Sequence, residues 1–217
     1  MGTRGPLAPK EVYHIYNRGT EKRNIFLTER DYERFIALLY LSNSKNPIKM
    51  EEQRGRTLRE LLETERGEPL VDIGAYCLMP NHFHLLLRQR EDGGISKFMQ
   101  KLVTGYTMYF NVKNDRTGTL FQGRYKSKHA GEDRYLKYLM SYIHLNPSAL
   151  FNSDSARSNL DAHLEAYQYS SYADYAGIYR PEGVLLTKDA LPLYFPTPAD
   201  FKRELHEWLQ YRDQLNQ

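Results

Sequence analysis

Two apolar runs separated by a short turn place the strongest constraint on the fold of this chain. Residues 70–78 and 82–89 are each long enough for a strand, and Met-Pro-Asn lies between them in the stretch LMPNHFHLLL. Apolar runs of this length bounded by turn residues predict a β-hairpin. A hairpin commits the chain to an antiparallel sheet, which the neighbouring segments must extend or cover.

The segment before the hairpin supplies a strand and a helix. Residues 11–17, EVYHIYN, alternate as a strand does, and Thr28 can cap a helix over residues 29–42. Residues 43–69 then carry many charges of both signs and include TLRELLETE, which predicts one short helix. We expect this charged excursion to be an insertion rather than part of the core.

The segment after the hairpin repeats this pattern. Ser96 can cap a helix over residues 97–113, and TLFQGRYKSKHA at residues 119–130 predicts a strand or bent ribbon. A further helix over residues 132–146 should end at Pro147, because the residue before a proline disfavours the α region. The order β-α-β-β-α-β, with one helix after it, predicts an α+β fold. It is the ferredoxin-like split β-α-β arrangement, an antiparallel sheet with helices packed on one face.

The regular pattern weakens after Pro147, and this sets the expected domain limits. We predict a main domain over residues 1–150 that contains the insertion at 43–69. Residues 151–217 would form a C-terminal extension packed on or beside it, with an amphipathic helix starting near Pro198.

Composition excludes several classes of protein. Of the 217 residues, 41% are apolar and 26% charged, and no apolar run approaches the roughly 18 to 20 residues that cross a bilayer. The start, MGTRGPLAPK, lacks the apolar centre of a signal peptide. A single cysteine, Cys77, excludes an internal disulfide framework. We therefore expect a cytoplasmic protein without a membrane partner.

The distribution of charge is more informative than the net charge of +3. Basic residues outnumber acidic ones by nine to three between Lys97 and Lys137, so the rest of the chain is slightly acidic. Concentrated positive charge beside many tyrosines favours a polyanionic partner, with nucleic acid as the first candidate. A solvated basic surface is the alternative.

The two histidines of the hairpin raise the question of a metal site. Residues i and i+2 of a strand project from the same face, so His82 and His84 can direct their imidazoles at one ion while Phe83 packs on the other face. Two imidazoles suit several divalent metals but do not complete a coordination shell. Two buried imidazoles with satisfied hydrogen bonds are the alternative. Cys77 fits the core better than a ligand set.

A second pair of polar residues lies on the helix that precedes Pro147. Tyr142 and Asn146 are four residues apart, so the hydroxyl and the amide can converge on one point of its surface. A tyrosine oxygen near a divalent cation and a phosphate can attack phosphorus. Packing with a hydroxyl at the surface is the ordinary role of any of the 18 tyrosines.

Several stretches together resemble one known family. YHIYNRGTEKRNIF, AYCLMPNHFHLLL, GTLFQGRYKS, YLMSYIHLNP and YQYSSYADY occur in the order seen in REP-associated tyrosine transposases, which belong to the single-tyrosine HUH transposase superfamily. The resemblance covers roughly residues 11 to 180. It implies a ferredoxin-like domain that cleaves and rejoins single-stranded DNA at hairpin-forming sites.

The resemblance also implies a role for each candidate residue. His82 and His84 match the metal-binding pair, and Asn146 stands where the superfamily often has a glutamine as third ligand, so the cofactor would be Mg²⁺ or Mn²⁺. Tyr142 matches the nucleophile, which would form a 5′-phosphotyrosine link. The candidates for contacts with the DNA backbone are Arg18, Lys97, Lys101, Arg124, Lys126 and Lys128.

The partner expected from this resemblance is single-stranded or hairpin DNA, met at the nucleoid. The protein would act as a monomer or a homodimer. Two alternatives remain open: a domesticated transposase that binds structured DNA or RNA without cutting it, and a metal-dependent nuclease that uses water as its nucleophile.

Overall fold

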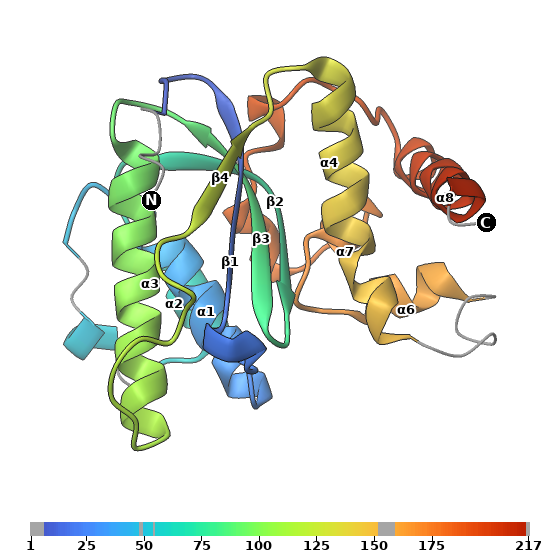
Figure 1. Ribbon diagram of the computed structural model, residues 1–217. Helices are drawn as coiled ribbons and strands as arrows, with labels where there is room; N and C mark the ends of the chain where they lie inside the picture. The colour runs from blue at the N-terminus through green and yellow to red at the C-terminus, as the bar shows by residue number, and fades with distance from the viewer. Residues whose placement is uncertain (1–6, 48–49, 54, 152–158, 216–217) are drawn as a thin grey trace.

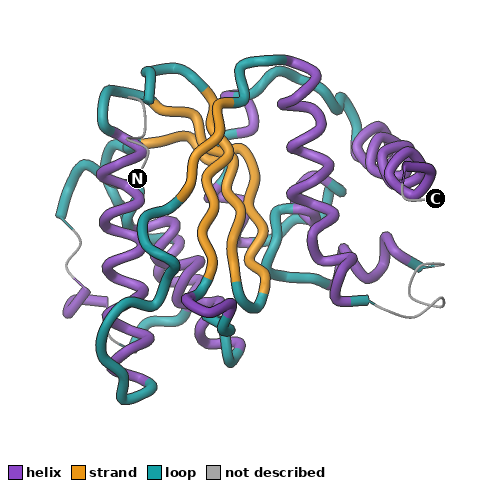
Figure 2. Tube along the Cα trace, viewed as in Figure 1, coloured by secondary structure: helices purple, strands orange, loops and turns teal. Residues whose placement is uncertain are grey.

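The computed structural model, which describes residues 7–47, 50–53, 55–151 and 159–215, is built around one antiparallel sheet (Figures 1 and 2). Its strands are β1 (Val12–Arg18), β2 (Val71–Met79), β3 (His82–Gln89) and β4 (Lys126–His129), in the order β2-β3-β1-β4. Each neighbouring pair is antiparallel, and a two-residue loop joins β2 to β3. This order confirms the predicted hairpin and the ferredoxin-like α+β arrangement.

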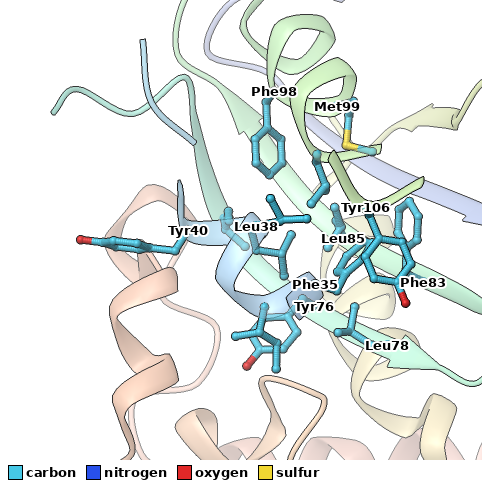
Figure 3. Close-up of a cluster of buried hydrophobic side chains, with 14 of the residues drawn as sticks. Phe35, Leu38, Tyr40, Tyr76, Leu78, Phe83, Leu85, Phe98, Met99 and Tyr106 are labelled. Carbon is cyan, nitrogen blue, oxygen red and sulfur yellow. The ribbon is translucent and has the colours of Figure 1, made fainter. Parts of the chain in front are cut away.

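Two helices, α1 (Glu29–Leu41) and α3 (Gly94–Lys113), cover one face of the sheet (Figure 1). Thr28 begins α1 through a capping box with Asp31, as the sequence predicts for that end. The core between these helices and the sheet is rich in aromatic rings, several of which Figure 3 shows. Phe35, Phe83 and Tyr106 are fully buried there, and the Phe35 ring contacts both of the others, which fixes the helices on the strands.

The start of α3 differs from the prediction. The helix begins at Gly94, with Gly93 as N-cap at a left-handed φ of 70°, so Ser96 lies within the first turn instead of capping it. Glycine adopts this backbone conformation without the steric cost that a Cβ would bring. Ile95 is buried, and this apolar contact draws the first turn into the core.

The charged excursion contains the one short helix that its sequence predicts, together with a 3-10 turn. The turn is η2 (Met50–Gln53), and the helix is α2 (Leu58–Leu62), which Thr57 and Glu60 begin with a capping box. Residues 48, 49 and 54 lie outside the described part. The excursion is nevertheless tied to the core at its base, because the Asn43 side chain bonds the backbone of Leu70 and Val71.

Helix α4 (Asp133–Leu145) covers the opposite face of the sheet from α1 and α3. This differs from the predicted packing of the helices on one face, because β2 is buried along its whole length and so needs cover on both faces. Leu136, Leu139, Met140 and Ile143 pack there against residues of β2 and β3. The helix ends at Leu145, just before Pro147 as the sequence predicts, and the chain continues as a 3-10 turn, η3 (Asn146–Leu150). Pro147 lies in the first turn of η3, where a proline is tolerated. Another short 3-10 turn, η1 (Thr20–Lys22), follows β1.

The C-terminal part runs along the outer edge of β2. It contains α6 (Leu160–Ala166), α7 (Tyr172–Tyr175), η4 (Pro181–Leu185), η5 (Lys188–Ala190) and α8 (Pro198–Leu215). Backbone hydrogen bonds join Leu78 to Tyr169, Tyr76 to Ser171 and Ile73 to Thr187, each at 2.9 Å. These contacts satisfy backbone groups that an edge strand would otherwise leave open.

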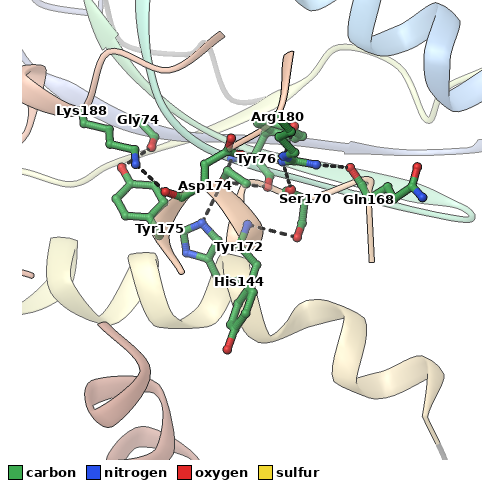
Figure 4. Close-up of polar contacts among 11 residues, drawn as sticks. Gly74, Tyr76, His144, Gln168, Ser170, Tyr172, Asp174, Tyr175, Arg180 and Lys188 are labelled. Carbon is green, nitrogen blue, oxygen red and sulfur yellow. Dashed lines mark hydrogen bonds and ion pairs between the residues drawn. The ribbon is translucent and has the colours of Figure 1, made fainter. Parts of the chain in front are cut away.

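A buried polar cluster anchors this segment (Figure 4). Arg180 forms an ion pair with Asp174 at 2.5 Å and donates to the Tyr76 hydroxyl at 2.9 Å. His144 Nδ1 lies 2.8 Å from the Met140 carbonyl, which can only accept, so the other ring nitrogen accepts from the Ser171 hydroxyl at 2.7 Å. The C-terminal segment is thereby joined to α4 and to the sheet.

None of the helices in the described part of the chain combines the length and the apolar character that a membrane crossing requires.

Candidate functional site

The candidate site lies on the face of the sheet that α4 covers. His82 and His84 project to this face from the first residues of β3, while Phe83 between them is buried in the core on the other side. Their ring centroids are 5.0 Å apart with the planes at 90°. His82 Nδ1 lies 2.6 Å from the Asn81 side-chain oxygen, in the loop just before the strand. The predicted same-face geometry of the two histidines is therefore present.

A third histidine, His14 of β1, adjoins this pair, and its role was not inferred from the sequence. Its Nε2 lies 2.8 Å from His84 Nδ1, and both side chains are buried. The alternation of side chains along β1 predicts that His14 and Tyr16 share one face of the strand. That this face lies beside the histidines of β3 follows from the register between the two strands, which places Tyr16 opposite His84. The bond with His14 occupies one ring nitrogen of His84 and fixes the direction of the other.

The second ring nitrogen of His84 is unusual. This Nε2 atom is buried and has no hydrogen-bond partner among the described residues. A buried polar atom without a partner costs free energy of about 1–3 kcal/mol, so proteins seldom retain one without a use. This nitrogen, at the centre of the site, is therefore available to bind a ligand.

Helix α4 brings Tyr142 and Asn146 to the same place. The Tyr142 ring lies 5.4 Å from the His84 ring and 6.1 Å from the His14 ring, edge-on to both. Asn146 Nδ2 donates to the Tyr142 carbonyl at 2.7 Å, which leaves the amide oxygen of Asn146 for another partner. The i, i+4 pair predicted from the sequence thus meets the histidine pair across the interface between α4 and the sheet.

Burial shifts the pKa of His82, His84 and Tyr142. It lowers the pKa of His84 well below its ordinary value, and the neighbouring His14 and His82 add to this effect. It also lowers the pKa of His82, with Arg18 acting in the same direction and a hydrogen bond with Asn146 opposing it. Both imidazoles are therefore neutral near pH 7, which is the form that binds a metal. Burial raises the pKa of Tyr142, which a hydrogen bond with Asn146 partly offsets.

The residues present fit a divalent cation with mixed nitrogen and oxygen ligands. Among the described residues, no group of three His, Cys, Asp or Glu side chains is placed to hold a metal ion. A metal site here would therefore need an amide oxygen as third ligand, and Asn146, which lies beside the two neutral imidazoles, is the candidate for it. The unpartnered Nε2 of His84 is the observation in favour of such a site.

Three of the six predicted DNA contacts lie on this same face. Arg18 is paired with His82 in the sheet, and Lys126 and Lys128 of β4 are paired with Tyr16 and His14 of β1. Directly paired residues project to the same side of a sheet, so all three cations border the site. All three are exposed to solvent.

The other three predicted contacts lie elsewhere. Arg124 precedes β4 and lines a groove of about 750 Å³ between α3 and the ribbon over residues 118–125. Lys97 and Lys101 belong to α3, on the opposite face of the sheet from the histidines. Lys101 has a different role, because its ammonium donates to the Ser44 and Asn46 carbonyls at 2.6 Å each. It holds the base of the charged excursion against α3.

Comparisons with known proteins agree with the fold and give the family. A solved structure described as a REP-associated tyrosine transposase bound to a REP hairpin superimposes with a TM-score of 0.52 at 12% identity. The match covers 84% of this chain and 90% of that one. No curated protein sequence matches the chain significantly. The family model described as "Transposase IS200 like" matches residues 11–146, which run from β1 to Asn146 and make up more than half of the chain. The chain therefore belongs to the family of IS200-like transposases.

Proposed function

We propose that this protein cleaves single-stranded DNA at hairpin-forming sequences and rejoins the strands through a covalent link to Tyr142. The observation that carries the proposal is the meeting of Tyr142 with His84, whose rings lie 5.4 Å apart, beside an unpartnered imidazole nitrogen. The place of action would be the nucleoid. That the solved relative in fold is bound to a REP hairpin supports a DNA hairpin as the partner.

The chemistry is a transesterification at phosphorus. The Tyr142 oxygen attacks the scissile phosphate and loses its proton, and the bond from phosphorus to the 3′ oxygen breaks. The departing oxygen takes up a proton, which leaves a 3′-hydroxyl and a 5′-phosphotyrosine. The number of phosphodiester bonds is conserved, so a second 3′-hydroxyl can reverse the step without an external energy source.

Other residues of the chain would hold the metal ion and the DNA strand during this reaction. His82, His84 and Asn146 would hold a divalent cation, Mg²⁺ or Mn²⁺, which when bound polarises a non-bridging oxygen of the phosphate. Asn146 also orders the end of α4 through its bond to the Tyr142 carbonyl. Arg18, Lys126 and Lys128 would contact the DNA backbone at the border of the site and orient the strand.

The experiment is a search for the covalent adduct. The protein is incubated with Mn²⁺ and labelled, hairpin-bearing single-stranded oligonucleotides drawn from the neighbourhood of its own gene, then run on a denaturing gel. We expect a protein-bound label with the wild type and none with Tyr142→Phe or in EDTA. Tyr179→Phe is the matched control, because that side chain is 98% exposed and belongs to the C-terminal segment.

Other outcomes would reject the proposal in different ways. Repeated cleavage without an adduct, retained by Tyr142→Phe, would indicate that water is the nucleophile. Binding that survives EDTA, with no cleavage under any metal, would indicate a protein that holds structured nucleic acid without cutting it.

A further inference from the structure

Helix α4 carries a row of three tyrosines that leads to the proposed nucleophile. The rings of Tyr135 and Tyr138 are 5.9 Å apart and nearly parallel, at 20°, and those of Tyr138 and Tyr142 are 5.9 Å apart at 19°. Spacings of three and four residues keep all three on one side of the helix. The rings therefore form a regular series that starts near β4 and ends at the site.

Helix α8 extends this series with the only tryptophan in the sequence. The Trp208 ring lies 5.5 Å from the Tyr138 ring at 53°. An ion pair between Lys137 and Glu204, at 2.7 Å, joins the same two helices, and Phe201 and Leu205 fix α8 in the core. We call Tyr135, Tyr138, Tyr142 and Trp208 the aromatic row.

The aromatic row is not ordinary core packing. Tyr138, at its centre, is 39% exposed, and the other three members are half-buried. Tyrosines of the interior of this protein, such as Tyr76 and Tyr106, are by contrast fully buried. The row therefore offers flat aromatic surface to solvent directly beside the site.

The charges beside the aromatic row are suited to a polyanion. Lys128 of β4 places its ammonium 4.2 Å from the centre of the Tyr135 ring, and Lys126 lies two residues before it on the same face. Two of the neighbouring carboxylates are engaged: Glu204 pairs with Lys137, and Asp133 accepts from the Tyr194 hydroxyl at 2.5 Å. Cations thus border the row along β4.

We propose that the aromatic row stacks the unpaired bases of single-stranded DNA next to the scissile phosphate, while the phosphates follow Lys126 and Lys128. Stacked rings bordered by cations are the usual means of holding single strands without regard to sequence, because every base has a flat face. The inference rests on the proposed function and adds a subsite to it. Duplex DNA would not use this surface, since its bases already stack on one another.

The test uses Trp208 as a built-in probe. A thymidine oligomer of about 20 nucleotides is titrated into the full-length protein in EDTA, where cleavage cannot occur, and the fluorescence of the single tryptophan is followed. An abasic oligomer of equal length and charge serves as the comparison. We expect quenching by the thymidine oligomer only, since stacking requires bases. Equal quenching by both oligomers, or none by either, would overturn the proposal.

Variants of Tyr138 give an independent measurement, made by anisotropy of labelled oligomers. Tyr138→Ala should weaken binding of the thymidine oligomer on the order of tenfold and leave the abasic oligomer within about twofold. Tyr138→Phe keeps the ring and should bind as the wild type does. Tyr179→Ala is the matched control for loss of a tyrosine. Equal affinities for Tyr138→Ala and Tyr179→Ala would refute the aromatic row as a base-binding surface.

The two proposals fail separately. Quenching without a covalent adduct in Mn²⁺ would support the aromatic row and refute the cleavage. A covalent adduct without base-dependent quenching would support the cleavage and refute the aromatic row.

Discussion

Replacing His14 with phenylalanine should weaken the binding of metal although it leaves all three proposed ligands, His82, His84 and Asn146, in place. His14 acts as a positioning residue, because its Nε2 contacts His84 Nδ1 at 2.8 Å and so directs the opposite nitrogen of His84 into the site. Phenylalanine carries a flat ring only one atom larger and can keep the stacking on Tyr16, whose centroid is 4.9 Å away. The substitution therefore removes one hydrogen-bond partner and little else.

The expected magnitudes follow from that single loss. Leaving His84 Nδ1 without a partner in a buried position should lower the free energy of unfolding by about 1–3 kcal/mol. The change of ring should itself cost less than about 1.5 kcal/mol, because the volume is almost conserved. Loss of a group that orients a metal-binding histidine typically costs about 10- to 100-fold in metal affinity. We expect a shift of that size in the Mn²⁺ concentration that gives half-maximal adduct.

Two measurements on the same samples separate orientation from folding. Adduct formation is followed over a Mn²⁺ titration, and stability is measured by urea unfolding. His129→Phe is the matched control: it removes a histidine from β4, on the other face of the sheet, whose side chain is 53% exposed. If His14→Phe loses stability but keeps the Mn²⁺ midpoint of the wild type, His14 is a packing residue and the orienting role is wrong.

Three further predictions concern the scaffold. Burial raises the pKa of the Asp31 carboxyl, but hydrogen bonds from Lys113 and from backbone N–H groups outweigh it, so the pKa lies below its ordinary value. Asp31→Asn should therefore cost about 1–3 kcal/mol at pH 7, a difference that shrinks as the pH falls below about 4, as urea unfolding at several pH values will show. Phe83→Ala should cost about 3–5 kcal/mol in the same assay, because it empties a fully buried position in the core. Arg180→Met should cost about 3–5 kcal/mol by stranding the buried carboxylate of Asp174, and limited proteolysis should then cut first in the C-terminal segment.

Local signals account for the parts of the fold that the sequence predicts. The hairpin, the cap at Thr28 and the pairing of Tyr142 with Asn146 depend on residues a few positions apart, where chain geometry alone decides the outcome. The contact between His14 and His84 spans 70 residues and depends on the register of β1 against β3, which no local pattern encodes. Likewise, the charge of Lys101 suits DNA, but the nearby carbonyls of residues 44 and 46 compete for its ammonium and bind it.

The pairing of the C-terminal segment with β2 has a consequence for how the protein is made. The backbone of Tyr76 bonds the Ser171 side chain, 95 residues further along the chain. At about 5–20 residues per second, a ribosome needs about 5 to 20 s to add that length. During this interval β2 is an uncovered strand edge, so the nascent chain should depend on chaperones until its last third has emerged.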